Sequence, residues 1–369
     1  MSERGSWFRR WLLPAFAFKA VVIGGGYATG REIAEFFLPN GPWGGLLGMI
    51  LAAALWSVVC MMSFLFARAS ASLDYQSFFK SLLGRFGVVF EIAYAPFLVL
   101  VLAVFGAAAG AIGQAALGWP TLVGACLLAT LIALVTAFGN TSVERLFKYV
   151  SIFLYATYAV LVLCVSRFGG PIQSAFTTPQ PIGHGWALGG LTYAGYNIIG
   201  AVVILPVVRH MTSNRDAVIA GLVCGPLAMA PAIVFFICMA AFTPGIQSAA
   251  LPSDVLLQRL DLPIFRLVFQ AMIFLALLES GTGLVNAVVE RIAHTWSAAR
   301  PGQTLSPRMR LLLAAVVLVV SIFLAGRFGL VTLIAKGYPV LAWVFLAIYV
   351  APLLTIGVMK LRGRRAAAA

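Results

Sequence analysis

A helix-length apolar stretch, residues 21–37, is interrupted by glycines and charges. Its centre is the run Gly24, Gly25, Gly26, Tyr27, Ala28, Thr29 and Gly30, and the charges that follow are Arg31, Glu32 and Glu35. Glycine weakens a helix, and a charge at the centre of a bilayer costs about 3 kcal/mol on insertion scales. Unwound backbone at membrane depth is tolerated only where it is buried in protein or lines a cavity. These residues therefore indicate a binding site within a membrane protein.

The break between two half-helices offers groups for ion binding. The first half ends in unpaired carbonyl groups, which attract a cation, and the second begins with unpaired amides, which attract an anion. We expect the amides of Ala28, Thr29 and Gly30 to hold a carboxylate, with the Thr29 hydroxyl as a further donor.

A second interrupted stretch, residues 189–197, lies in the apolar run 185–208. Its polar and aromatic groups come from Tyr193, Tyr196 and Asn197. The run 86–114 offers Phe97 and Phe105 near mid-depth, and Phe105 is expected to contact the substrate. Small-molecule pockets are mostly apolar with a few directed polar groups. The pattern favours a small zwitterion such as an amino acid and argues against a large polyanion.

The charges within the apolar runs fall at two depths. Arg31, Glu32, Glu35 and Lys336 belong to the outer level, whereas Lys19 and Glu279 belong to the inner level. Opposite charges at each level suggest gates that form and break as access alternates, with Glu32 or Glu35 facing Lys336 outside and Lys19 facing Glu279 inside. Alternatively, Arg31 and Glu35 neutralise each other, because they are spaced i,i+4 on a helix.

The coupling ion stays open at this point. Glu279 is a candidate proton carrier, because a carboxyl group in a low-dielectric site favours its protonated form unless it is paired. Ser280 and Thr282 could instead bind sodium together with carbonyl groups of the first span. Lys148 is either a cytoplasmic loop residue or an ammonium group that occupies a sodium site. Apart from a possible bound Na⁺, no cofactor or metal is expected.

The composition of the chain predicts which type of secondary structure carries these groups. The chain has 369 residues, of which 62% are hydrophobic and 10% charged, whereas soluble domains carry about 25% charge. This predicts an all-α polytopic membrane protein with one membrane domain, residues 1–369. Ten apolar runs are long enough to be transmembrane helices. They are residues 11–38, 43–69, 86–114, 119–138, 147–166, 185–208, 217–241, 263–288, 309–326 and 329–357.

The positive charges predict the orientation. Most of the 25 Lys and Arg residues fall in segments on one side of these spans, and that side is cytoplasmic. Both termini are therefore expected in the cytoplasm of a bacterium, and the spans in its inner membrane, with lipid and no nucleic acid as partner. Residues 70–85 should form a cytoplasmic interfacial helix. Residues 248–262 should form a short outer helix capped by Ser253, which is either a connector or a lid.

The two interrupted spans are related by symmetry. They are the first and sixth of ten, and because five is odd, the two halves would insert with opposite orientations. Glycine-interrupted segments at corresponding positions indicate an inverted-repeat transporter. The repeats would cover about residues 11–166 and 185–357.

These residues also resemble a known family. Residues 23–37, IGGGYATGREIAEFF, closely resemble the pattern of the YkvI-like membrane proteins, and residues 281–292, GTGLVNAVVERI, resemble the end of that family's eighth span. TYAGYN at 192–197 resembles the broken sixth helix of permeases of the amino acid–polyamine–organocation superfamily. The resemblance implies a LeuT-type five-plus-five inverted repeat with broken helices 1 and 6. It also implies substrate contacts from Gly24 to Gly30 and from Tyr193 to Asn197, Ala194 and Gly195 included, and an outer gate between spans 1 and 10. The chain departs from the family pattern at Arg31, where glutamine is usual, and at Gly25, where alanine is usual.

Together these features predict a secondary active transporter that works by alternating access. Its solute would be small and amino acid-like or an amine, coupled to protons or sodium, with spans 1, 2, 6 and 7 rocking against 3, 4, 8 and 9. The alternative is a non-transporting ligand sensor of the same fold. An enzyme is not expected, because the three histidines lie in loops or at span ends without a nucleophile–base cluster. The oligomeric state is left open.

Overall fold

The computed structural model describes residues 7–137, 153, 166–299 and 306–368, and these residues form helices without a strand. Five helical stretches among them are long and apolar enough to cross a membrane: Arg31–Ser70, Tyr75–Leu117, Asn214–Ala240, Pro263–Val289 and Pro307–Gly363. Except for residues 153 and 166, the predicted span 147–166 with Lys148 lies outside the described residues. The polytopic helical class is therefore confirmed, and the number of ten spans stays a prediction.

The first predicted span is broken, as expected. It consists of η1 (Phe8–Leu12), α1 (Leu13–Val22), α2 (Gly25–Ala28) and α3 (Arg31–Phe36). The chain leaves the helical conformation at Ile23, where ψ is 71°, and again at Gly30, where φ is 76°. A positive φ is accessible to glycine without strain, so Gly30 allows α3 to begin in a new direction.

The sixth predicted span is also broken, but later than expected. It consists of α10 (Trp186–Asn197), α11 (Gly200–Val203) and η5 (Leu205–His210), with the interruption at residues 198–199. The expectation that residues 189–197 unwind is wrong. A Cβ on Gly189 would lie 2.1 Å from the carbonyl oxygen of Phe36, and one on Gly190 would lie 2.5 Å from that of Gly48. These glycines therefore serve close packing of helices.

Apart from the span 147–166, the remaining predicted spans agree with described helices to within a few residues, except that α14 runs beyond its predicted end. The described elements are η2 (Leu38–Asn40), α4 (Gly41–Ser70), α5 (Tyr75–Leu83), η3 (Gly84–Gly87), α6 (Val88–Leu117), α7 (Thr121–Ala137), η4 (Ser166–Phe168), α9 (Gly169–Thr177), α12 (Asn214–Ala240), α13 (Pro252–Arg259), α14 (Pro263–Ala299), α15 (Pro307–Thr332), η6 (Leu333–Gly337), α16 (Tyr338–Phe345), η7 (Leu346–Val350), η8 (Leu353–Gly357) and α17 (Val358–Ala368). The last two predicted spans are separated by a turn at Gly329, where φ is 70°.

Both predicted short helices are present. In α5, the Asp74 side chain accepts a hydrogen bond from the amide of Ser77 and caps the helix, while Phe78 and Phe79 are buried in the protein. Helix α13 begins at Pro252 with Leu251 as its N-cap, so Ser253 does not cap it as expected. Instead, the amide of Ser253 donates to the carbonyl oxygen of Thr29 at 3.0 Å, which ties α13 to the break in the first span.

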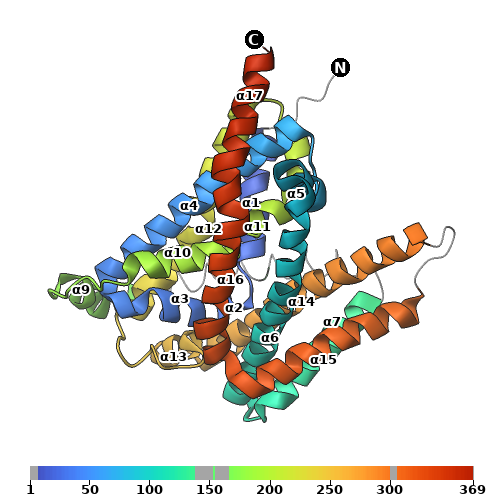
Figure 1. Cartoon of the computed structure of the whole chain (residues 1–369). Helices are drawn as coiled ribbons and strands as arrows, with labels where there is room; N and C mark the ends of the chain where they lie inside the picture. Colours follow the sequence, from blue (N-terminus) through green and yellow to red (C-terminus); the bar gives the residue numbers. More distant parts are fainter. Residues whose placement is uncertain (1–6, 138–152, 154–165, 300–305, 369) are drawn as a thin grey trace.

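The helices form two packed groups (Figure 1). Helices α1, α4, α10 and α12 pack together on one side, and α6, α7, α14 and α15 pack together on the other. Helix α16 packs against both α10 and α6. These groups correspond to spans 1, 2, 6, 7 and spans 3, 4, 8, 9 of the sequence-based prediction.

Two hydrogen bonds join helices at the end of the molecule where the chain termini lie. Lys360 of α17 donates to the carbonyl oxygen of Ser81 in α5 at 2.7 Å, and Arg68 of α4 donates to that of Met211 at 3.2 Å. We call the end that carries η1, α5 and α17 the termini end. The opposite end, which carries α3 and α13, is called the α13 end.

Candidate functional site

A cavity of about 340 Å³ lies between the two helical groups and brings together residues from both broken spans. Of the predicted site residues, it is lined by Gly24, Glu32, Phe105, Tyr196, Asn197, Glu279 and Ser280. The sequence reasoning missed Tyr94 and Tyr338, which also line it. Tyr94 lies three residues before Phe97 on α6, and this helical spacing could have indicated a shared face.

Part of the predicted site lies elsewhere. Tyr27, Ala28 and Thr29 are fully buried and do not line the cavity. The amide of Ala28 donates to the carbonyl oxygen of Gly24 at 3.1 Å, and that of Gly30 donates to Tyr27 at 3.1 Å. The predicted carboxylate cradle from these two amides is therefore not formed, because both amides are hydrogen-bonded within α2 and the bend that follows it.

Tyr193, Ala194 and Gly195 also have packing contacts rather than a place in the cavity lining. Trp56 of α4 donates its indole N–H to the carbonyl oxygen of Ala194 at 3.2 Å. The ring of Tyr193 packs against Phe37 at 5.0 Å between centroids. Tyr193 lies on the same face of α10 as Tyr196 and Asn197, which follow it at i+3 and i+4. Only Tyr196 and Asn197, one turn further along the helix, line the cavity.

The α13 end of the cavity is formed by Glu32 and two tyrosines. The hydroxyl group of Tyr196 donates to the Glu32 carboxylate at 2.7 Å. The rings of Tyr196 and Tyr338 lie 4.2 Å apart between centroids. Glu32 is 4% exposed and Tyr338 is 2% exposed, so this end is closed.

The termini end of the cavity is open. Val21 of α1 and Val203 of α11 line the cavity there and are 39% and 44% exposed. Ala287 of α14 is also exposed at this end. Among the described lining residues, those at the termini end are exposed and those at the α13 end are buried.

The charges of the predicted outer gate are arranged differently from the expected pairs. Arg31 forms an ion pair with Glu35 and also donates to the carbonyl oxygens of Gln247 and Ala249. The structure therefore agrees with the alternative expectation that Arg31 and Glu35 neutralise each other. Lys336 is exposed, and in the described part of the chain it forms no ion pair with Glu32 or Glu35, so the expected pairing across spans 1 and 10 is absent from this structure.

Of the predicted inner groups, Glu279 and Ser280 lie on the α14 wall of the cavity. Lys19 is 8% exposed and Thr282 fully buried, and neither lines it. The Thr282 hydroxyl has no hydrogen-bond partner among the described residues. Oxygen ligands suit hard cations, so the oxygens of Glu279, Ser280 and Thr282 are compatible in type with a bound sodium ion.

Comparisons with known proteins bear on the fold that holds this site. No family model matches the chain. The uncharacterized membrane protein YkvI of Bacillus subtilis (strain 168) is 24% identical over 338 residues, which cover 90% of this chain and 92% of that protein. The crystal structure of MhsT in complex with L-phenylalanine has a TM-score of 0.62 at 16% identity and covers 94% of this chain and 92% of that one. The chain has the LeuT-type fold. A Na⁺-coupled sialic acid symporter in a substrate-bound outward-open state has a TM-score of 0.58 at 15% identity, with 91% and 79% of the two chains covered.

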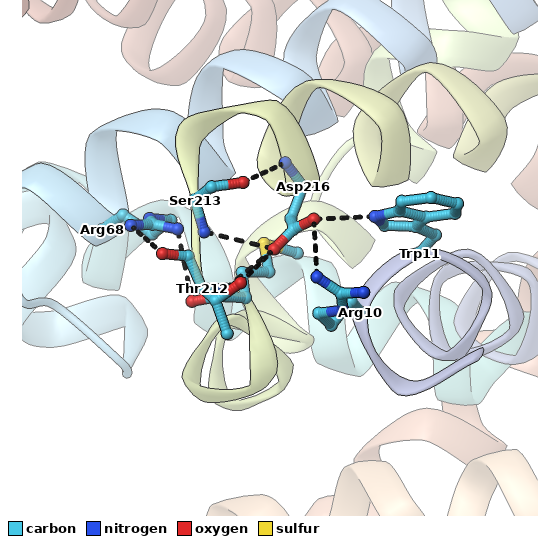
Figure 2. Close-up of polar contacts among 7 residues, drawn as sticks. Arg10, Trp11, Arg68, Thr212, Ser213 and Asp216 are labelled. Atoms are coloured by element: carbon cyan, nitrogen blue, oxygen red, sulfur yellow. Dashed lines mark hydrogen bonds and ion pairs between the residues drawn. The ribbon is translucent and has the colours of Figure 1, made fainter. Parts of the chain in front are cut away.

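A polar cluster joins elements of the first helical group of this LeuT-type fold at the termini end (Figure 2). Asp216 at the start of α12 accepts hydrogen bonds from the indole of Trp11 at 2.8 Å and from the amide and hydroxyl of Thr212 at 2.9 and 2.8 Å. Arg10 lies 3.7 Å from the same carboxylate, and Arg68 of α4 donates to the carbonyl oxygen of Thr212. We call these residues the Asp216 cluster. It links η1, α4, the segment after η5 and α12, so these parts of the LeuT-type fold are held together where the cavity opens.

We expect Gly24→Val to close the cavity. A Cβ at position 24 would lie 3.3 Å from the tip of the Phe105 ring, and the further methyl groups of valine would extend into the space beside it. Binding of a cavity ligand should fall by at least tenfold in a calorimetric titration of the purified protein.

The double variant Gly24→Val/Phe105→Ala is the matched control for this prediction. It removes the ring that the valine meets and should recover a measurable part of the binding. Equal loss in both variants would show that Gly24 acts through backbone conformation and not through space beside Phe105.

Proposed function

We propose that this protein is a secondary active transporter of a small amine or amino acid-like solute that works by alternating access. The observation that carries the proposal is the cavity between the two broken spans, which is closed at the α13 end and open at the termini end. Ligand sites near mid-membrane at broken helices are the common arrangement in inverted-repeat transporters. The similarity to a Na⁺-coupled sialic acid symporter supports transport over an enzymatic role.

The proposed cycle has the rocking motion of one helical group against the other. The group of α1, α4, α10 and α12 would move together, because the Asp216 cluster joins parts of it at one end. In the proposed orientation, with both termini in the cytoplasm of a bacterium and the spans in its inner membrane, the structure has its cavity open to the cytoplasm. Opening of the α13 end would then require Arg31 to leave its carbonyl partners and Tyr196 to separate from Tyr338.

We propose Gly24, Glu32, Phe105, Tyr196 and Asn197 as solute-contacting residues. Glu279 and Ser280 lie on the opposite wall of the same cavity and are proposed for coupling, with a proton carried on Glu279 or a sodium ion held by oxygens of both residues. The buried hydroxyl of Thr282 supports a sodium site next to them. Lys148 remains a coupling candidate from the sequence alone. We further propose that residues 1–369 form one domain.

The test is uptake into proteoliposomes that contain the purified full-length protein. A panel of radiolabelled amino acids and amines is offered under an imposed proton gradient, an imposed sodium gradient, or neither. Accumulation that requires one gradient supports the proposal and identifies the ion. Ligands that raise the thermal stability but never accumulate would instead support a non-transporting sensor.

Glu279→Gln is expected to uncouple uptake from a proton gradient. The amide cannot carry a proton between the two sides, so gradient-driven accumulation should fall at least tenfold while counterflow exchange of labelled for unlabelled solute continues. Ser280→Ala is the matched comparison, because it should impair accumulation only under a sodium gradient. Full gradient dependence in Glu279→Gln would remove this residue from proton coupling.

A further inference from the structure

The side chains that line the cavity carry charge of one sign. Glu32 and Glu279 contribute carboxylates from opposite walls, and no lysine or arginine occurs among the described lining residues. Three phenol rings and two phenylalanine rings surround the same space; they belong to Tyr94, Phe97, Phe105, Tyr196 and Tyr338. Aromatic faces attract cations, most strongly where water is excluded.

Glu32 is the deeper of the two carboxylates. It is 4% exposed, and the Tyr196 hydroxyl is the hydrogen-bond donor that the structure gives it. A carboxylate offers about four acceptor positions, and burial of an ionised carboxylate is costly unless an opposite charge compensates it.

Neither of the two cations expected beside Glu32 pairs with it. Arg31, the next residue, pairs with Glu35 and two carbonyl oxygens. Lys336 of the last span is exposed and forms no ion pair with Glu32 in the described part of the chain. The amides of Ala28 and Gly30, which would have favoured a carboxylate on the solute, are bonded within the backbone.

We propose that the cavity selects organic cations, namely small monoamines without a carboxylate, and that Glu32 is the counter-charge for the ammonium group. This selectivity narrows the substrate class of the proposed transporter, and its role in the cell rests on the proposed transport function. The ammonium group lies between the Glu32 carboxylate and the rings of Tyr196 and Tyr338, and the hydrocarbon part lies against Phe97 and Phe105. Glu279, nearer the open end, attracts the cation as it enters.

The experiment is a calorimetric titration of the purified full-length protein in detergent. The probes are two sets that share a hydrocarbon chain within each set: phenethylamine, L-phenylalanine and 3-phenylpropionate, and n-butylamine, L-norvaline and pentanoate. We expect at least one amine to bind at least tenfold more tightly than the zwitterion and the anion of its set. Tighter or equal binding of the zwitterion or anion, or no binding of either amine, overturns the proposal.

Variants then test the role of Glu32. Glu32→Gln keeps an oxygen that can accept the Tyr196 hydrogen bond but removes the charge, and it should abolish the preference for the amine. Glu91→Gln is the matched control, because Glu91 lies at the start of α6 outside the cavity lining, and it should keep the preference. A preference that survives in Glu32→Gln, in protein with unchanged thermal stability, overturns the assignment.

Uptake of the same probes separates this inference from the proposed function. If an amine binds but does not accumulate in proteoliposomes under any gradient, cation selectivity stands and transport fails. If L-phenylalanine or L-norvaline accumulates while no amine binds, transport stands and cation selectivity fails.

Discussion

Gly225→Ala is expected to lower the free energy of unfolding by about 3 kcal/mol, because overpacking against a fixed backbone costs 1–3 kcal/mol or more. A Cβ at this position of α12 would lie 2.0 Å from the carbonyl oxygen of Ala53 and 2.4 Å from the hydroxyl oxygen of Ser57, both in α4. The carbonyl belongs to the α4 backbone, so the two helices would have to separate. Gly221, one turn earlier, is equally close to the backbone of Met61, and such small residues at i,i+4 permit close contact of membrane helices. Thermal unfolding of the detergent-purified protein, followed by tryptophan fluorescence, measures the loss.

Gly326→Ala provides a control with the opposite expected sign. Gly326 lies in α15, and a Cβ there would meet no atom within 4 Å. Alanine is favoured over glycine in a helix by roughly 0.5–1 kcal/mol, so this variant should match or exceed the stability of the wild type. A similar loss of stability in both variants would contradict the packing explanation for Gly225.

Asp216→Ala is expected to release the N-terminal helix from the first helical group. The Asp216 side chain is 3% exposed and accepts hydrogen bonds from Trp11, Thr212 and the amide of Ser213. Each buried donor left without a partner costs about 1–3 kcal/mol, so the total loss should be about 3 kcal/mol. Hydrogen–deuterium exchange should become faster in η1 and at the start of α1, because Trp11 loses its partner.

The matched control for this prediction is Asp74→Ala. Asp74 also caps a helix, accepting from the Ser77 amide at 2.8 Å, but it belongs to an exposed turn and holds only α5. Loss of an N-cap costs about 1 kcal/mol, and exchange in η1 should not change. If Asp216→Ala behaved like Asp74→Ala in both measurements, the Asp216 cluster would be a local cap and not a link between helices.

Much of the fold could be predicted from sequence because membrane burial leaves a strong pattern. Apolar length located the helices, and the glycines and charges at 24–35 located the break in the first span. The second break was misplaced because glycine has two uses in a membrane helix. Gly189 and Gly190 bring α10 close to Phe36 and Gly48. The α-helical pattern is instead interrupted at Ile198 and Ile199, which keep right-handed helical φ and ψ and carry neither a glycine nor a charge as a signal.

The candidate site was predicted less completely than the fold, since pocket lining depends on where along each helix the cavity lies, and residues one turn apart share a face. Tyr196 and Tyr193 are equally polar in sequence, yet only Tyr196 lines the cavity. Tyr338 lies two residues after Lys336, and the sequence drew attention to the charge rather than to the ring that packs against Tyr196. The sequence also left the ion-pair partners of the outer charges open, because Glu32 and Glu35 could each face Lys336 while Arg31 could pair with Glu35 on its own helix.

In the proposed transport cycle, the contacts of Arg31 would favour one of the two access states. The guanidinium group bonds to Glu35 and to the carbonyls of Gln247 and Ala249, and the segment that carries these carbonyls continues into α13. A single hydrogen bond contributes about 1 kcal/mol net, so two carbonyl bonds made in one state alone would shift the ratio of the states by roughly thirtyfold at 1.4 kcal/mol per factor of ten. The favoured state would be the one with the cavity facing the termini end. A neutral glutamine at this position, as in the pattern that the sequence resembles, would hold that state less firmly, so the arginine would give this chain a resting orientation of its own.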